Sequence, residues 1–169
     1  VHQGVLSLLA LQAPVAGDLR VVAAVLYVIN NIERVGDQCV NIAKLIPLAG
    51  HVPEAPNELC ERILRMGALA RHELAQARRA FAERDVELAR SLAAQDLEVD
   101  RLGREAFRIA VRVGEDPLVR EWAMTMTLAA RALERIGDNA VDIAEQSIFM
   151  ATGDFRELPS PVSSAAPGS

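Results

Sequence analysis

Residues 33–43 read ERVGDQCVNIA and residues 134–144 read ERIGDNAVDIA, so the chain carries one segment twice at an offset of 101 residues. Seven of the eleven positions are identical, and the changes include Val to Ile and Asn to Asp. The second copy lies on an apolar stripe with spacings of three and four residues, which predicts an amphipathic helix. The first copy and its apolar lead-in, residues 21–29, are therefore expected to be helical too, and the protein is predicted to be an all-α tandem repeat.

Three helix starts are expected in the second half of the chain. Asn57 and Asp85 are residues that cap helices, and Asp116 followed by Pro117 is typical of a helix N-terminus. Three such helices joined by short turns predict an antiparallel bundle. The predicted core positions are Leu59, Ile63, Met66, Ala70, Leu74, Ala77, Phe81, Leu92, Val99, Leu102, Ala106, Ile109, Val113, Trp122, Met126, Ala129, Leu133, Ile136, Ala140 and Ile143.

Proline, glycine and serine divide the chain into four parts. Residues 1–46 are expected to form an incomplete first helical repeat, and residues 47–57, with three prolines, a linker that cannot sustain a helix. Residues 58–152 are expected to form the second three-helix bundle. Residues 153–169 are rich in Pro, Ser, Ala and Gly, which predicts a disordered tail.

Composition and charge exclude several classes of protein. The 169 residues carry 18 basic and 23 acidic side chains, a net charge of −5, which is unfavourable for nucleic-acid binding. The longest apolar run, residues 21–29, is too short to cross a membrane. Cys39 and Cys60 show no metal-binding or redox spacing, which favours a reducing, cytoplasmic location. The chain starts without Met, so we expect that it begins inside a larger protein.

Each copy of the repeat contains an acidic pair four residues apart: Glu33 and Asp37, and Glu134 and Asp138. Residues at this spacing share one helix face, and adjacent carboxylates are ligands for hard cations. The spacing alone is weak evidence, because about three such pairs are expected by chance and the chain has six.

The glycine inside each pair adds specificity. Gly36 and Gly137 stand inside predicted helices, where glycine costs about 1 kcal/mol relative to alanine. Their repetition indicates that some group approaches the backbone closely at both places. A metal site with ligands from a neighbouring helix would need this room, and tight helix packing alone would need it as well.

Asp96 and Asp100 form a third acidic pair, on the helix that precedes the second copy. Antiparallel packing could bring this pair beside Glu134 and Asp138 and so assemble four carboxylates. The alternative is a solvated acidic face that is neutralised by neighbouring arginines, Arg101 and Arg104.

The two copies, together with residues 8–20 (LLALQAPVAGDLR), resemble the PhoU family. The resemblance implies two similar three-helix bundles that bind metal ions, such as iron, manganese, zinc or magnesium, at their surface. It also implies a non-enzymatic regulator of phosphate uptake that links the phosphate ABC transporter, through its ATPase subunit, to a sensor histidine kinase. Such a regulator keeps the phosphate-starvation response off when phosphate is plentiful.

The same resemblance implies the site residues and the setting of the protein. The implied metal ligands are Glu33, Asp37, Asp96, Asp100, Glu134 and Asp138. The implied protein is a cytoplasmic homodimer, held at the inner face of the membrane through its partners rather than inserted in it.

The chain departs from the family pattern at its start. By the offset of 101, Val1 corresponds to Leu102, so the first bundle lacks its first helix and most of its second. The partners of Glu33 and Asp37 would precede residue 1. We therefore expect residues 21–29 to be exposed, and the chain to be a fragment or to dimerise.

Two other classes of protein, a di-iron enzyme and a metal-free interaction module, can be compared with the residues of this chain. A di-iron enzyme in a helical bundle needs Glu-x-x-His pairs, but His2, His51 and His72 have no Glu three residues before them. Nucleophile and glycine-rich phosphate motifs are absent as well, so no enzyme is expected. A metal-free helical module for protein interactions stays open.

Overall fold

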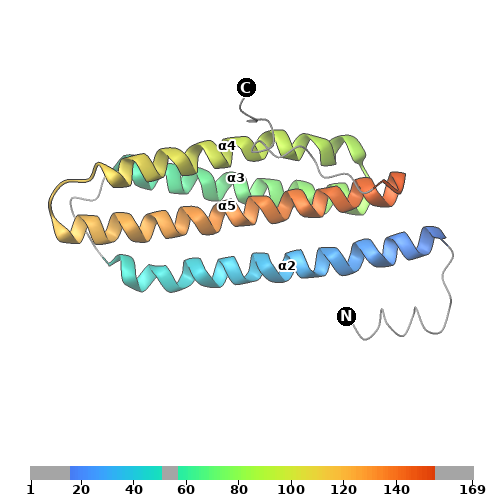
Figure 1. Ribbon diagram of the computed structural model, residues 1–169, viewed down its shortest axis with the longest axis horizontal. Helices are drawn as coiled ribbons and strands as arrows, with labels where there is room; N and C mark the ends of the chain where they lie inside the picture. The colour runs from blue at the N-terminus through green and yellow to red at the C-terminus, as the bar shows by residue number, and fades with distance from the viewer. Residues whose placement is uncertain (1–15, 51–56, 155–169) are drawn as a thin grey trace, which may run out of the picture.

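Four helices make up the structure, a computed structural model that describes residues 16–50 and 57–154. They are α2 (Ala16–Ala49), α3 (Asn57–Glu83), α4 (Val86–Val111) and α5 (Pro117–Thr152) (Figure 1). The described ranges contain no strand, which confirms the all-α prediction.

Helices α3, α4 and α5 pack against one another as an antiparallel bundle, and α2 lies along α5. In Figure 1, α3 and α5 run in one direction, and α2 and α4 run in the other. Helices α3, α4 and α5 thus form a three-helix bundle, and α2 is attached to the last of these helices.

Two of the expected capping residues set the starts of α4 and α5. Asp85 accepts a hydrogen bond from the backbone N–H of Leu88 at 2.9 Å, and Asp116 accepts one from Leu118 at 2.8 Å. These bonds satisfy amide groups that have no partner inside the helix. Pro117 occupies the first turn of α5, and Gly153, with φ of 80°, ends it in the left-handed conformation that glycine adopts without strain.

The bundle core follows the predicted stripes. Every predicted core position is buried or half-buried. One cluster gathers around Leu92 and Ile143, and a second around Met66, Val99 and Trp122. Burying each large apolar side chain of this kind contributes about 1.5–3 kcal/mol, which is why the three stripes fix how the helices pack.

The repeat seen in the sequence is also a structural repeat. Both copies of the motif lie inside a long helix, the first in α2 and the second in α5. The two helices are antiparallel, and equivalent residues of two antiparallel helices meet only near a two-fold axis. Val35 and its equivalent Ile136 belong to one buried cluster with Ala70 of α3, so a local pseudo-two-fold axis passes near them.

The predicted start of the linker, Pro47, was wrong. Helix α2 continues through Pro47 to Ala49, and Gly50, with φ of 59°, follows it. Proline in the last turn removes a single backbone hydrogen bond and leaves the preceding turns intact, so the helix tolerates it there. Residues 16–18 of the predicted interruption at residues 13–18 also lie in helix α2.

The apolar run 21–29 is less exposed than expected. Ala24 and Val28 are buried, and Val28 lies in the same cluster as Ile143 of α5. The exposed apolar side chains of α2 lie mostly on either side of this run. They are Leu19, Tyr27, Ile32, Val40, Ile46 and Leu48.

No helix in the described ranges is long and apolar enough to cross a membrane. The predicted disordered tail lies outside the described residues from position 155 on. Most of the predicted linker also lies outside them, at residues 51–56.

Candidate metal centre

Five carboxylates from three helices meet on the bundle and form what we call the acidic cluster. They are Glu73 of α3, Asp96 and Asp100 of α4, and Glu134 and Asp138 of α5. Antiparallel packing of α4 against α5 brings the two predicted pairs together, as one interpretation of the sequence required. Asp138 is the most exposed of the five residues and Glu73 the most buried.

Two glycines make room for the acidic cluster. A Cβ atom at Gly137 would collide with the Asp96 carboxylate and would lie 3.0 Å from Oε2 of Glu73. A Cβ atom at Gly103 of α4 would collide with the Glu134 carboxylate. The expectation of a close approach at Gly137 is therefore confirmed, and the group that approaches is a carboxylate rather than an apolar side chain.

The deepest oxygens of the acidic cluster lack hydrogen-bond partners. Glu73 is 1% exposed, and both of its carboxylate oxygens are buried without a hydrogen bond to any described residue. Oδ1 of Asp96 is likewise buried without a hydrogen bond to any described residue. A buried polar atom without a partner costs about 1–3 kcal/mol, so three such oxygens in one place need an explanation.

The cluster strongly favours the protonated form of its buried members. Burial, followed by the charges of Asp96, Asp100 and Asp138, raises the pKa of Glu73 to about 8. Burial likewise raises the pKa of Asp96 to about 7, with Asp138 as the next cause. The pKa of Asp138 is also raised, first by burial. At neutral pH the cluster therefore holds protons where a cation could replace them.

Arginines neutralise only the rim of the acidic cluster. Arg131 donates a hydrogen bond to Oε2 of Glu134 at 2.8 Å, and Arg104 lies 3.9 Å from Asp100. Arg101 does not contact Asp96 or Asp100 in the way the solvated-face interpretation required.

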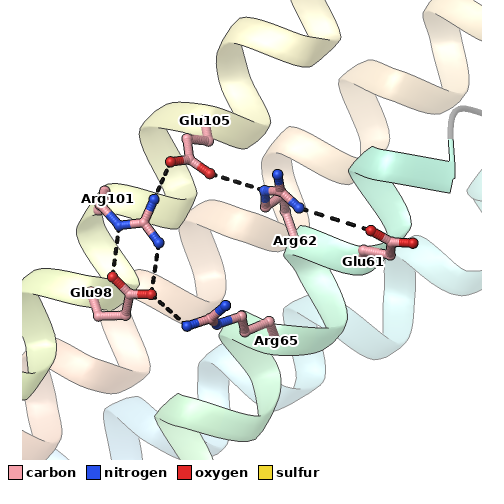
Figure 2. Close-up of polar contacts among 6 residues, drawn as sticks. All are labelled: Glu61, Arg62, Arg65, Glu98, Arg101 and Glu105. Atoms are coloured by element: carbon pink, nitrogen blue, oxygen red, sulfur yellow. Dashed lines mark hydrogen bonds and ion pairs between the residues drawn. The ribbon is translucent and has the colours of Figure 1, made fainter.

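Figure 2 shows where Arg101 is engaged instead. Its guanidinium bridges Glu98 and Glu105 along α4. These two glutamates also bind Arg65 and Arg62 of α3, at 2.8 and 2.9 Å. The network therefore ties α3 to α4 and leaves the acidic cluster without a neutralising partner at its centre.

The donor set fits a hard cation. It consists of carboxylate oxygens alone, three of them orphaned, beside two glycine backbones that leave space. As the side chains stand, no three acidic, histidine or cysteine residues in the described ranges are placed to hold one metal ion together. Binding would therefore require the carboxylates to rotate inward.

The acidic pair of the first repeat does not belong to the acidic cluster. Glu33 and Asp37 are exposed on α2. A Cβ atom at Gly36 would meet nothing within 4 Å among the described residues. The predicted ligands thus divide into four that belong to the acidic cluster and two that do not.

Glu73 was missed by the sequence analysis. It stands on the apolar stripe of α3, three residues after Ala70 and four before Ala77, where the period calls for a core residue. An ionisable residue at a core position is almost never fully buried without a partner. This break in the stripe was the available signal.

Comparisons with known proteins agree with the repeat and the fold. The family model described as the PhoU domain matches residues 1–46 and 63–147. A protein of Mycobacterium tuberculosis named phosphate-specific transport system accessory protein PhoU homolog 2 is 33% identical over 154 residues, covering 88% of this chain and 69% of the relative. A PhoU homolog of Pseudomonas aeruginosa is 33% identical over 153 residues, covering 89% of this chain and 63% of the relative.

A solved structure supports the same assignment. The crystal structure of PhoU from Pseudomonas aeruginosa superposes with a TM-score of 0.82 at 32% sequence identity, covering 90% of this chain and 73% of that one. The doubled motif, the bundle and these matches lead to one conclusion: the chain belongs to the PhoU family.

Proposed function

We propose that this protein is an accessory regulator of phosphate transport that acts by binding rather than by catalysis. The names of its relatives as phosphate-specific transport system accessory proteins support this role. The family is one of accessory proteins, and the role needs a stable helical surface rather than a reactive group.

The regulator binds metal ions through the acidic cluster. The observation that carries this step is the group of orphaned oxygens on Glu73 and Asp96, because a cation would satisfy all of them at once. Iron, manganese, zinc and magnesium all accept carboxylate oxygens. A bound ion would neutralise the mutual repulsion of the acids and join α3, α4 and α5.

The partners follow from the family resemblance. They are the ATPase subunit of the phosphate ABC transporter and a sensor histidine kinase, both met on the cytoplasmic side of the membrane. Through them the protein keeps the phosphate-starvation response off when phosphate is plentiful. A homodimer is the proposed form of the protein.

A metal-free interaction module is the second candidate. One observation favours it: the described side chains do not stand ready around a single metal position. In that case Glu73 keeps its proton at neutral pH, and the cluster is part of the bundle without a bound ion.

Elemental analysis of the purified chain distinguishes the two candidates. The parent protein should contain iron, manganese, zinc or magnesium after dialysis, and Asp96→Asn/Asp138→Asn should lose it while its helical circular dichroism is retained. Parent protein that stays metal-free after incubation with each of these ions would favour the interaction module.

The regulatory role has a separate test in the source organism. A reporter of the phosphate-starvation response should become active in phosphate-rich medium when the protein is deleted. It should also become active with chromosomal Asp96→Asn/Asp138→Asn. A reporter that stays off after the deletion would refute the regulatory proposal, whatever the metal content.

A further inference from the structure

A basic groove runs between α2 and α5, on a protein whose net charge is −5. Its volume is about 360 Å³. Cations and amides line it together with three apolar residues, and no carboxylate does. The lining residues are Gln38, Asn41, Lys44, Leu45, Leu128, Arg131, Ala132 and Arg135.

The cations of the basic groove are poorly neutralised. Lys44, the only lysine of the chain, and Arg135 form no ion pair with any described residue. Arg131 is engaged with Glu134, but it also lines the groove. Positive charges held close together without a counterion make a favourable place for an anion.

Positive charge continues beyond the basic groove. Arg131 also lines a second pocket, of about 520 Å³, between α4 and α5. Arg104 and Arg108 line that pocket as well, and Arg108 has no ion-pair partner among the described residues. Glu134 lines that pocket too, so its three arginines stand against one carboxylate, and positive charge extends beyond the groove.

The repeat accounts for the basic character of this groove only in part. Under the offset of 101 residues, Lys44 corresponds to Glu145, Asn41 to Asp142, and Arg131 to Asn30. Arg135 corresponds to Arg34, so one of the three cations is kept at the equivalent position and the other two are replaced by Glu145 and Asn30.

We propose that the basic groove binds a phosphate-class oxyanion, either free inorganic phosphate or the phosphoryl group of a lipid headgroup. Arginine presents parallel N–H groups that match phosphate oxygens in pairs, and Lys44 adds a compact charge. The side-chain amides of Gln38 and Asn41 can donate further hydrogen bonds. Leu45 and Leu128 form apolar walls, which lower the local dielectric and strengthen these contacts.

Arg131 connects the basic groove to the acidic cluster. Its bond to Glu134 competes with the oxyanion for the same guanidinium. Removing the Glu134 charge should therefore strengthen oxyanion binding. The cations of the groove do not depend on a bound metal, so the proposal holds for the metal-free protein as well.

Calorimetric titration of the chelator-treated full chain with inorganic phosphate, at constant ionic strength, tests the proposal. Lys44→Gln and Arg135→Gln should each weaken binding about tenfold, which corresponds to about 1.4 kcal/mol. Glu134→Gln should strengthen it. Arg78→Gln is the matched control, since Arg78 is an exposed arginine of α3 that lines neither pocket, and it should leave binding unchanged.

Vesicle co-sedimentation distinguishes the two sources of the phosphoryl group. Binding to phosphatidylglycerol-containing vesicles that Arg135→Gln abolishes, without binding of free phosphate, would identify a lipid headgroup. Saturable binding of free phosphate would identify the small anion. The proposal is overturned if neither is bound, or if Arg78→Gln weakens binding as much as Arg135→Gln does.

Discussion

Helices α2 and α5 carry the same motif, but the residues packed around the motif differ between them. On α5, a Cβ atom at Gly137 would run into the Asp96 carboxylate, whereas on α2 a Cβ atom at Gly36 would meet no described atom within 4 Å. Glu134 is half-buried beside other acids, and its equivalent Glu33 is exposed.

The difference teaches that the motif supplies only part of a site. A helix with Glu-x-x-x-Asp provides two carboxylates and a bare backbone between them. The remaining carboxylates come from helices that pack across that backbone, as α3 and α4 do against α5. Three of the four predictions below compare equivalent positions of α2 and α5, and the other compares Glu73 of α3 with Glu33 of α2.

The largest expected difference is in metal affinity. Glu134→Gln/Asp138→Asn should weaken metal binding at least about a hundredfold, because each substitution removes a charged ligand and each tenfold loss is about 1.4 kcal/mol. The equivalent Glu33→Gln/Asp37→Asn should leave the affinity unchanged. Titration with a metal-sensitive competitor dye measures both, and equal losses in the two variants would refute the assignment to the second repeat.

The second difference is in packing. Leu133 contacts two apolar clusters, whereas its equivalent Ile32 is 56% exposed. Leu133→Ala should lower the free energy of unfolding by about 2–3 kcal/mol through the cavity it leaves. Ile32→Ala should change it by less than about 0.5 kcal/mol. Urea denaturation provides both values, and a large loss in Ile32→Ala would mean that another surface covers α2 in solution.

The third difference is in how the free energy of unfolding depends on pH, and only the buried acids should produce it. The pKa of Glu73 is about 8 in the folded protein against 4.5 for the free side chain, so the folded state holds the proton more tightly. The contribution of Glu73 to stability is therefore fully present below pH 4.5 and is lost as the pH rises through about 8.

Denaturation of the metal-free protein at pH 6 and pH 8 measures this effect. Between pH 6 and pH 8, the free energy of unfolding of the parent should fall by on the order of 2 kcal/mol more than that of Glu73→Gln. The control Glu33→Gln should follow the parent. Identical slopes for the parent and Glu73→Gln would show that Glu73 does not hold a proton at neutral pH.

The smallest difference is between the two glycines. Gly36→Ala should raise stability by about 1 kcal/mol, since alanine is the better helix former and the space is open. For a chain of this size that is about 2–4 °C in melting temperature. Gly137→Ala should not gain this, because the Asp96 carboxylate must move, and it should weaken metal binding. Scanning calorimetry compares the two, and an equal gain in both would contradict the close approach at Gly137.

Local chemistry was predictable wherever a residue and its neighbours along the chain were sufficient. Asp85 and Asp116 cap helices as expected, and the apolar stripes mark the core. The end of α2 was misjudged because Pro47 was treated as a helix breaker, although a proline in the last turn removes one backbone hydrogen bond and leaves the preceding turns intact.

The acidic cluster was predictable only in part. The repeat and the glycine pointed to Glu134 and Asp138, and antiparallel packing made Asp96 and Asp100 reasonable additions. Glu73 escaped notice because it stands alone on its stripe, with no partner four residues away. Its burial depends on side chains of α4 and α5 that are distant in sequence.

The sequence by itself determined the helices, their caps, the tandem repeat and the two acidic pairs, because each depends on spacings within one or two helical turns. Only the tertiary structure decided which pair joins a cluster, which arginines stay without a counterion, and that Arg131 lies between the basic groove and Glu134. The physical reason is that charge and burial depend on what packs alongside a helix, and similar segments on α2 and α5 have different neighbours.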